Sequence, residues 1–261
     1  MLGRIVLGLV TMALGTVSAV EATTLWVGND TASPVERFDS VTQASLGFFG
    51  QTGATGSALD GAGHVYTVAP SFGNNVIQKY DAAQNVVASF IAAINGQWIE
   101  DMTYGGGGTL WVSTFEGDVF HIDGAGNVLS SFTTGGSFVG VATDGAFLYT
   151  TTGFNGDNTI TKRLFDGSVV SVVTTGFGGG SGIGYDASDN TFWVGYLGGQ
   201  LRHFDVAGNL LGGFITSTAD NGHDGLEVGE ITEAAVPEPT VLTVLGVSLL
   251  GLAGAAWSRH R

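Results

Sequence analysis

The sequence predicts an all-β fold, a five-bladed β-propeller, and three observations carry that prediction. Short segments rich in β-branched and aromatic residues recur with a period of about 40 to 45 residues, the length of one propeller blade. Each complete copy holds four such segments, which suits a four-stranded sheet. The first copy lacks its leading strand, whereas one extra strand, residues 224–228, follows the last copy. A C-terminal strand that joins the N-terminal blade would close the ring and leave no open sheet edge there.

The repeat is clearest over residues 109–132. Residues 110–112, Leu-Trp-Val, are large or β-branched, as a packed and pleated strand requires. Two more strands are expected over 119–122 and 128–132. In the four-stranded copy, the three segments are the second, third and fourth strands. Between the third and the fourth, residues 124–127 read Gly-Ala-Gly-Asn, which are the residues that a tight hairpin needs for positive φ angles.

One residue at the end of the third strand marks the period of the repeat. It reads as an aspartate in every copy, and the separations are 42, 42, 43 and 39 residues: Asp39, Asp81, Asp123, Asp166 and Asp205. Six blades would follow if one boundary is misplaced. An open β-solenoid is the competing fold, but it would not explain the displaced closing strand.

The first 22 residues have the composition of a secretory signal peptide. Arg4 makes the start positive, an apolar run extends to about Leu14, and small residues offer cleavage after Ala19 or Ala22. A buried N-terminal helix is the alternative. The propeller domain is therefore expected over residues 23–232.

Residues 233–261 are expected to form a separate C-terminal segment. Pro237, Glu238 and Pro239 precede an apolar run over 240–257, and the prolines prevent a helix or strand from running through. About 18 residues at a 1.5 Å rise give roughly 27 Å of helix, close to the ~30 Å hydrocarbon core of a bilayer. Taken alone, the segment predicts a transmembrane helix that anchors an outward-facing domain.

A basic end completes this segment. Arg259 and Arg261 favour a tail on the cytoplasmic side. Pro-Glu-Pro, one apolar helix and a basic end, in that order, resemble the PEP-CTERM sorting signal of Gram-negative bacteria. The resemblance implies recognition by an exosortase, a transient inner-membrane anchor, and delivery to the cell surface or beyond in association with extracellular polysaccharide. A permanent membrane tail is the alternative.

Charge and cysteine content narrow the function further. Residues 23–236 carry five cations and 21 acidic residues, a net charge near −16. Phosphate backbones would be repelled, so no nucleic-acid partner is expected. An anionic polysaccharide would need a bridging cation such as Ca²⁺, although acidity is also an ordinary solubility feature of exported proteins. The chain has no cysteine, so packing and sheet closure must stabilise it without disulfides.

The hairpin between the third and fourth strands resembles the repeats of NHL-type and gluconolactonase-like propellers. It reads Asp-Gly-Ala-Gly-Asn over 123–127 and Asp-Val-Ala-Gly-Asn over 205–209, is looser over 81–85, and is lost after Asp166. Because the motif builds a turn, the resemblance concerns structure and does not report a substrate.

Acidic residues around the inner strands are candidates for a metal site. Glu100, Asp101, His223, Asp224 and Glu227 are expected to converge near one mouth of the central channel, and hard oxygen ligands suit Ca²⁺. The gluconolactonase resemblance implies a metal-dependent hydrolase at this place. The ligand positions are not filled from blade to blade, which departs from that pattern.

Aromatic and histidine residues give one binding candidate. Trp98, just before an inner strand, is the tryptophan considered for a binding face. Three other tryptophans share one position of the second strand and are expected in the core between blades: Trp26, Trp111 and Trp193. His121 and His203 share a third-strand position on different blades, which places them too far apart to bind one metal ion.

These observations predict a non-enzymatic, exported binding or matrix protein at the cell surface or outside the cell. Its expected partners are exopolysaccharide or another surface protein. No nucleophilic motif is recognisable: Gly-x-Ser-x-Gly is absent from the sequence. The alternative function is a metal-dependent propeller hydrolase of the lactonase type.

Overall fold

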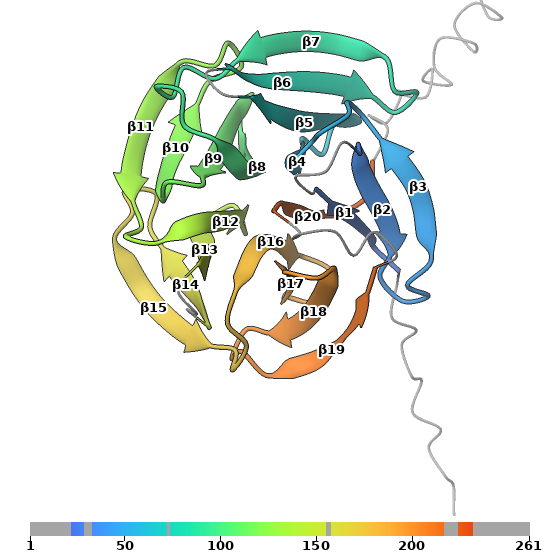
Figure 1. Cartoon of the computed structure of the whole chain (residues 1–261), viewed down its shortest axis with the longest axis vertical. Helices are drawn as coiled ribbons and strands as arrows, with labels where there is room; N and C mark the ends of the chain where they lie inside the picture. The colour runs from blue at the N-terminus through green and yellow to red at the C-terminus, as the bar shows by residue number, and fades with distance from the viewer. Residues whose placement is uncertain (1–21, 29–32, 72–73, 155–157, 217–223, 232–261) are drawn as a thin grey trace, which may run out of the picture.

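The computed structural model describes residues 22–28, 33–71, 74–154, 158–216 and 224–231, and these form a five-bladed β-propeller. Five antiparallel sheets of four strands each stand around one axis (Figure 1). The innermost strand of each sheet lies by the axis and the outermost strand lies on the circumference. The fold class and the blade count predicted from the sequence are therefore confirmed.

We number the blades from the N-terminal end and give their strands from the axis outward. Blade 1 is β20 (Leu226–Val228), β1 (Thr24–Val27), β2 (Val35–Asp39) and β3 (Ser45–Phe49). Blade 2 is β4 (Gly56–Leu59), β5 (His64–Ser71), β6 (Asn74–Asp81) and β7 (Val86–Ile91). Blade 3 is β8 (Ile99–Gly106), β9 (Thr109–Thr114), β10 (Asp118–Ile122) and β11 (Val128–Thr133). Blade 4 is β12 (Ser137–Thr143), β13 (Leu148–Phe154), β14 (Thr159–Arg163) and β15 (Val169–Thr174). Blade 5 is β16 (Gly180–Asp186), β17 (Thr191–Tyr196), β18 (Gln200–Asp205) and β19 (Leu210–Ile215).

The two ends of the domain share blade 1. Strand β20 pairs antiparallel with β1, with Trp26 opposite Glu227 and Val27 opposite Leu226. The indole Nε1 of Trp26 also donates to the carbonyl of Gly229 at 2.8 Å. The predicted closure of the ring by a C-terminal strand is confirmed, and it joins residues about 200 positions apart in the sequence.

The second and third strands of every blade are joined by the same cross-strand pair. An aromatic residue on the second strand lies opposite a cationic residue or a histidine on the third, and such ring and cation–π contacts stabilise neighbouring strands. The five pairs are Trp26 with Arg37, Tyr66 with Lys79, Trp111 with His121, Tyr149 with Lys162, and Trp193 with His203. The group-to-centroid distances range from 4.3 Å in the Trp111–His121 stack to 5.5 Å for Arg37 over Trp26. This pairing explains why the two histidines share a repeat position.

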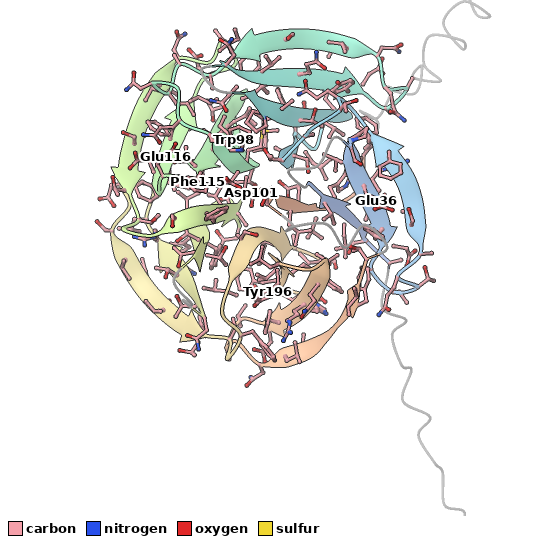
Figure 2. The ribbon with its side chains drawn as sticks, in the orientation of Figure 1. Glu36, Trp98, Asp101, Phe115, Glu116 and Tyr196 are labelled. Carbon is pink, nitrogen blue, oxygen red and sulfur yellow. The ribbon has the colours of Figure 1, made fainter. Side chains whose placement is uncertain are left out.

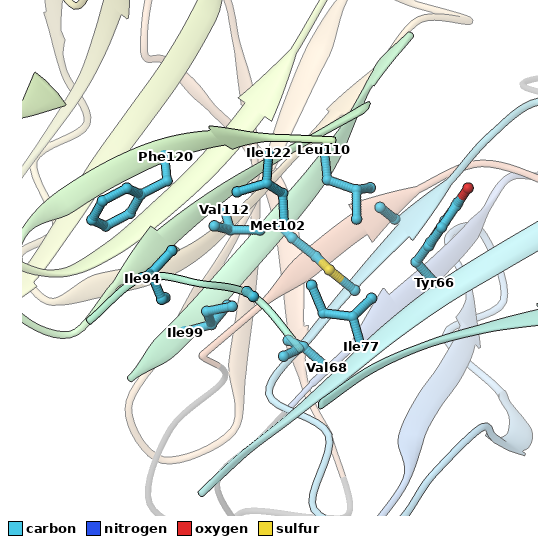
Figure 3. Close-up of a cluster of buried hydrophobic side chains, with 12 residues drawn as sticks. Tyr66, Val68, Ile77, Ile94, Ile99, Met102, Leu110, Val112, Phe120 and Ile122 are labelled. Atoms are coloured by element: carbon cyan, nitrogen blue, oxygen red, sulfur yellow. The ribbon is translucent and has the colours of Figure 1, made fainter. Parts of the chain in front are cut away.

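The hydrophobic core is divided into five clusters, and each fills the seam between two neighbouring blades. Figure 3 shows the seam of blades 2 and 3, where Met102 and Ile99 pack against Val68 and Ile77. The three second-strand tryptophans, Trp26, Trp111 and Trp193, are buried in other seams, as their shared position predicted. Because each seam needs both of its blades, the blades stabilise one another around the whole ring.

The prediction that Asp166 ends the third strand of blade 4 is wrong. Strand β14 ends at Arg163, and Leu164 takes the place that the aspartate holds in the other blades. The amide of Leu164 donates to the carbonyl of Ser168, just as that of Asp123 donates to Asn127. With Leu164 in the series, the spacings are 42, 42, 41 and 41 residues. The irregular spacing came from a turn whose aspartate sits two residues later.

Both predicted export segments lie outside the described residues. Of the predicted signal peptide (1–22), only residue 22 is among the described residues. The predicted segment 233–261, with its helix at 240–257, lies wholly outside them. In the described ranges there is no helix of the length and apolarity that a membrane crossing requires. The sorting signal and its residues remain predictions.

Candidate functional site: the channel and its exit mouth

The central channel is closed by one carboxylate. Asp101, on β8, is fully buried near the axis of the ring (Figure 2). Its Oδ1 accepts hydrogen bonds from the amides of Met102 at 2.8 Å and Leu226 at 3.2 Å, and its Oδ2 from those of Val141 at 3.1 Å and Ile183 at 3.2 Å. These four donors belong to the inner strands of blades 3, 1, 4 and 5. One side chain therefore ties together four of the five blades.

The other blades carry glycine where blade 3 carries Asp101. The position reads Gly56, Asp101, Gly140, Gly182 and Gly225 around the ring. A Cβ on Gly225 would lie 2.9 Å from Oδ1 of Asp101 and 2.3 Å from the carbonyl oxygen of Thr55. A Cβ on Gly182 would lie 2.8 Å from the backbone of Gly225. The strands approach so closely at the axis that only one side chain fits, and the glycines leave the space for it.

A second buried carboxylate lies next to this plug. Glu227, on β20, accepts a hydrogen bond from the hydroxyl of Thr103 at 3.1 Å and one from the amide of Val228 at 3.0 Å. Burial raises the pKa of Glu227 to about 7. Burial also raises the pKa of Asp101 well above its ordinary value. The amide hydrogen bonds act to lower this pKa, and the nearby Glu227 charge acts to raise it. The two groups therefore share one dry, acidic region.

Beyond Glu227 the channel widens into a pocket of about 310 Å³ at the end where the inner strands finish. We call this pocket the exit mouth. All five inner strands or the turns after them contribute to its wall. The groups with hydrogen-bonding or stacking capacity are the carboxylates of Asp60, Asp144 and Glu227, the hydroxyl of Thr103, and the tyrosines Tyr104 and Tyr185.

Two similar modules build opposite parts of the exit mouth. In the first, Asp60 accepts from Nζ of Lys79 at 3.0 Å, Lys79 lies over the ring of Tyr66, and Tyr66 stacks on Tyr104. The Nδ1 atom of His64 also lies 2.8 Å from Asp60. Burial acts to raise the pKa of Asp60, but the Ala62 amide, Lys79 and His64 outweigh it, so the pKa falls below its ordinary value. Asp60 is therefore an anion at neutral pH.

The second module uses the same residue types in blades 4 and 5, but its aspartate contacts the tyrosine and not the lysine. Asp144 accepts a hydrogen bond from the hydroxyl of Tyr149 at 2.6 Å, Lys162 lies over Tyr149, and Tyr149 stacks on Tyr185 at 5.9 Å. Burial acts to raise the pKa of Asp144, but the Tyr149 hydroxyl and two backbone amides outweigh it and lower the pKa. Each module thus presents one tyrosine and one ionised carboxylate to the mouth.

The residues predicted as metal ligands are only partly brought together. Asp101 and Glu227 are neighbours, but both oxygens of Asp101 are engaged by amides, so it would bind a metal ion only by giving up those bonds. Glu100 and Asp224 are buried beside the inner strands, and His223 lies outside the described residues. Among the residues that the structure describes, no three His, Asp or Glu side chains are grouped to hold a metal ion. The calcium site stays a prediction.

Trp98 lies away from the exit mouth. It is half-buried at the start of β8, its amide donates to a carboxylate oxygen of Glu116 at 3.2 Å, and its carbonyl accepts from the amide of Phe115. A binding role for Trp98 stays a prediction.

Sequence reasoning missed the exit mouth. Asp60 and Asp144 follow the inner strands of blades 2 and 4 at one repeat position, and Tyr104 and Tyr185 hold the preceding position in blades 3 and 5. The signal was therefore present in the repeat alignment. Of the metal-ligand candidates predicted from the sequence, only Glu227 lines the exit mouth, whereas Glu100, Asp101 and Asp224 stand at or before the starts of their inner strands.

The fold and the plugged channel define this chain as a five-bladed β-propeller. Among solved structures, it is similar to a protein of unknown function from Bacteroides caccae, with a TM-score of 0.53, 11% identity, and coverage of 80% of this chain and 100% of that one. It is also similar to a chain of the nidogen/laminin complex, with a TM-score of 0.54, 14% identity, and coverage of 81% and 100%. Comparisons with protein-family models and with curated proteins find no match. At these identities the likeness shows the fold alone.

Proposed function

We propose that this chain is an exported binding protein, without enzymatic activity, that holds exopolysaccharide at the cell surface or outside the cell. The observation that carries the proposal is the pair of similar modules in the exit mouth. Each offers a tyrosine ring for the apolar face of a sugar, next to an engaged carboxylate that makes the mouth negative. Two equivalent half-sites suit a ligand that itself repeats.

The charges in the mouth define the kind of polysaccharide. Asp60 and Asp144 are anionic at neutral pH, and the resident lysines are already engaged with these modules. A polyanion would meet repulsion from these carboxylates and from the net charge of −15. The proposed ligand is therefore a neutral or amino-sugar polysaccharide.

Calorimetric titration tests this proposal, with the exopolysaccharide of the producing cells and its neutral and anionic fragments as probes. Tyr104→Ala and Tyr185→Ala should each weaken binding about tenfold, and the double variant should abolish it, since each ring supplies about 1.4 kcal/mol. Phe115→Ala, which removes an exposed ring elsewhere, should bind like the wild type. Unchanged binding in the double variant would contradict the proposal.

Two further measurements address export and the hydrolase alternative. Mass spectrometry of the mature chain should find that residues 240–257 are missing after exosortase processing, and replacing Pro237 and Pro239 by alanine should retain them. Elemental analysis for calcium tests the metal-dependent alternative. A stoichiometric calcium content that is lost on replacing Glu100 and Asp224 would favour the hydrolase over the binding protein.

A further inference from the structure

The outermost strand of every blade lacks charged residues. The outermost strands β3, β7, β11, β15 and β19 contain no Asp, Glu, Lys, Arg or proline. We call these five strands the belt. The whole chain has 12% charged residues and a net charge of −15, so the belt differs from the rest of the surface. Figure 1 shows that its strands follow one another around the outside of the molecule.

The belt also holds most of the exposed apolar surface. Of the 19 large hydrophobic residues that are exposed in the described part of the chain, 13 lie on these five strands. Ile215 is 69% exposed, Val172 56% and Leu211 54%. Single exposed hydrophobic residues are ordinary, but a repeated band of them marks an interaction surface.

Each belt strand has an open edge. It pairs with the third strand of its own blade and with no other strand in the described part of the chain. Natural sheets guard such edges with lysine, proline, inward charges or β-bulges, and of these the belt has only the bulges. The bulge in each blade falls near the first residues of the belt strand and leaves the remainder regular. Beyond the bulge the outer edge is therefore available to another strand, whereas at the bulge of β3 the carbonyl of Leu46 already accepts a hydrogen bond from the Arg37 guanidinium at 2.9 Å.

On blade 5 the belt includes a hollow of about 390 Å³. It is lined by Leu210, Gly212, Gly213 and Ile215 of β19 and by Leu201 and Arg202 of β18. Gly212 has no atom within 4 Å of where a Cβ would stand, whereas the equivalent positions of β11 and β15 carry serine. The missing side chain leaves room for an apolar group from outside.

We propose that the belt binds the belt of a second copy of this chain. A second copy is the proposed occupant because the repulsion between two acidic rings is smallest where their uncharged belts face each other, and the exposed apolar side chains of the two belts can then bury one another. An identical open edge on the partner would pair its amides and carbonyls with those of the first copy, so that both edges are satisfied together. Since every ring has five such strands, one ring can join several neighbours and build an extended layer.

The experiment compares two matched pairs of lysine substitutions in the full chain, purified from the cells that produce it. Val170→Lys with Leu211→Lys charges the belt at residues 49% and 54% exposed. Val206→Lys with Leu197→Lys places the same change on turns of blade 5, at residues 48% and 57% exposed. The weight-average molecular mass in solution should rise with protein concentration for the wild type and for the turn variant, because both associate. The belt variant should associate at least about tenfold more weakly.

A cysteine crosslink reports contact directly, because the chain has no cysteine of its own. Under mild oxidation, Ser171→Cys on β15 should form disulfide-linked dimers at least about tenfold faster than Ala207→Cys on an exposed turn. A wild type that stays monomeric at every concentration overturns the proposal. So does association that the belt and turn variants weaken equally, or a crosslinking rate that is the same at both cysteines.

Discussion

Asp101 carries an unusual share of the contacts at the ring axis for a single side chain. Its two oxygens accept four amide hydrogen bonds, and a hydrogen bond in an interior without water contributes more than one at the surface. The glycines opposite leave no other side chain that could replace it. The identity of this residue is therefore set by packing and by hydrogen bonding at once.

We predict that Asp101→Ala lowers the free energy of unfolding by about 4 kcal/mol or more, because it leaves four buried amides without an acceptor. Asp101→Asn should lower the free energy of unfolding by about 2 to 4 kcal/mol, since the side-chain NH2 of asparagine would face backbone amides that are also donors. Urea denaturation followed by circular dichroism measures both values. Asp123→Asn in an exposed turn is the control and should change stability by less than about 1 kcal/mol. Equal stability of the Asp101 and Asp123 variants would show that the plug is dispensable.

Glu227 gives the domain a pH dependence whose sign can be worked out. Its folded pKa of about 7 lies above its ordinary value of 4.5, so the folded state holds the proton more tightly than the unfolded chain does. Its contribution to stability is complete below about pH 4.5 and is lost as the pH rises toward 7 and beyond. The shift corresponds to at most about 3 kcal/mol.

Comparison of the wild type with Glu227→Gln isolates this effect. Burial lowers the pKa values of His121 and His203, which adds an opposite trend below about pH 6.5 in both proteins. Subtracting the two stability profiles between pH 5 and pH 8 removes the histidine contribution. The free energy of unfolding of the wild type minus that of Glu227→Gln should be about 2 to 3 kcal/mol larger at pH 5 than at pH 8. A flat difference would contradict the raised pKa.

At the scale of elements, the hairpin between the third and fourth strands also connects blades. The carbonyl of Gly126, in the blade 3 hairpin, accepts a hydrogen bond at 2.9 Å from the amide of Ala93, just after β7 of blade 2. A Cβ on Gly126 would lie 2.2 Å from the carbonyl oxygen of Ile91. Gly208 approaches Thr174 of blade 4 in a similar way. The Ala-Gly pair of the motif thus serves the turn and the contact with the preceding blade.

We predict that Gly126→Ala costs at least about 2 kcal/mol more than Gly145→Ala. Both glycines have positive φ, +87° and +84°, so both variants pay the same backbone strain of about 1 kcal/mol or more. Only Gly126 meets the backbone of another blade, whereas the place of a Cβ on Gly145 has nothing within 4 Å. Thermal denaturation of the two variants measures the difference. Equal losses of stability would mean that the contact between this hairpin and the neighbouring blade does not contribute to stability.

The same hairpins show how far sequence reasoning reaches. Asp123 and Asp205 could be placed correctly because the turn chemistry, Asp followed four residues later by Asn, is local and visible. Asp166 was misplaced because blade 4 uses a different turn, in which the backbone of Leu164 makes the equivalent bond. The exit mouth was missed for another reason. Its modules join residues from different blades. The closed ring determines which strand ends converge, whereas the sequence repeat gives only the order of the strands.

At the scale of the whole molecule, the ring depends on its last strand. Strand β20 supplies the inner strand of blade 1, the amide of Leu226 that reaches Asp101, and Glu227 of the exit mouth. Without it, β1 would be an open edge with Trp26 and Leu25 uncovered. The seam between blades 5 and 1 would also lose Leu226 and Val228.

We predict that a chain ending after Thr216 loses the cooperative unfolding transition of the propeller, and that a peptide of residues 224–231 added in trans restores it. The peptide should act because strand addition to the open edge of β1 rebuilds the sheet and the bond to Asp101 together. The same peptide with Leu226→Pro lacks the amide that Asp101 accepts and cannot pair regularly, so it should fail. Calorimetry at rising peptide concentration measures the recovery. A truncated chain that unfolds as cooperatively as the full chain, or equal rescue by both peptides, would show that ring closure does not depend on this strand.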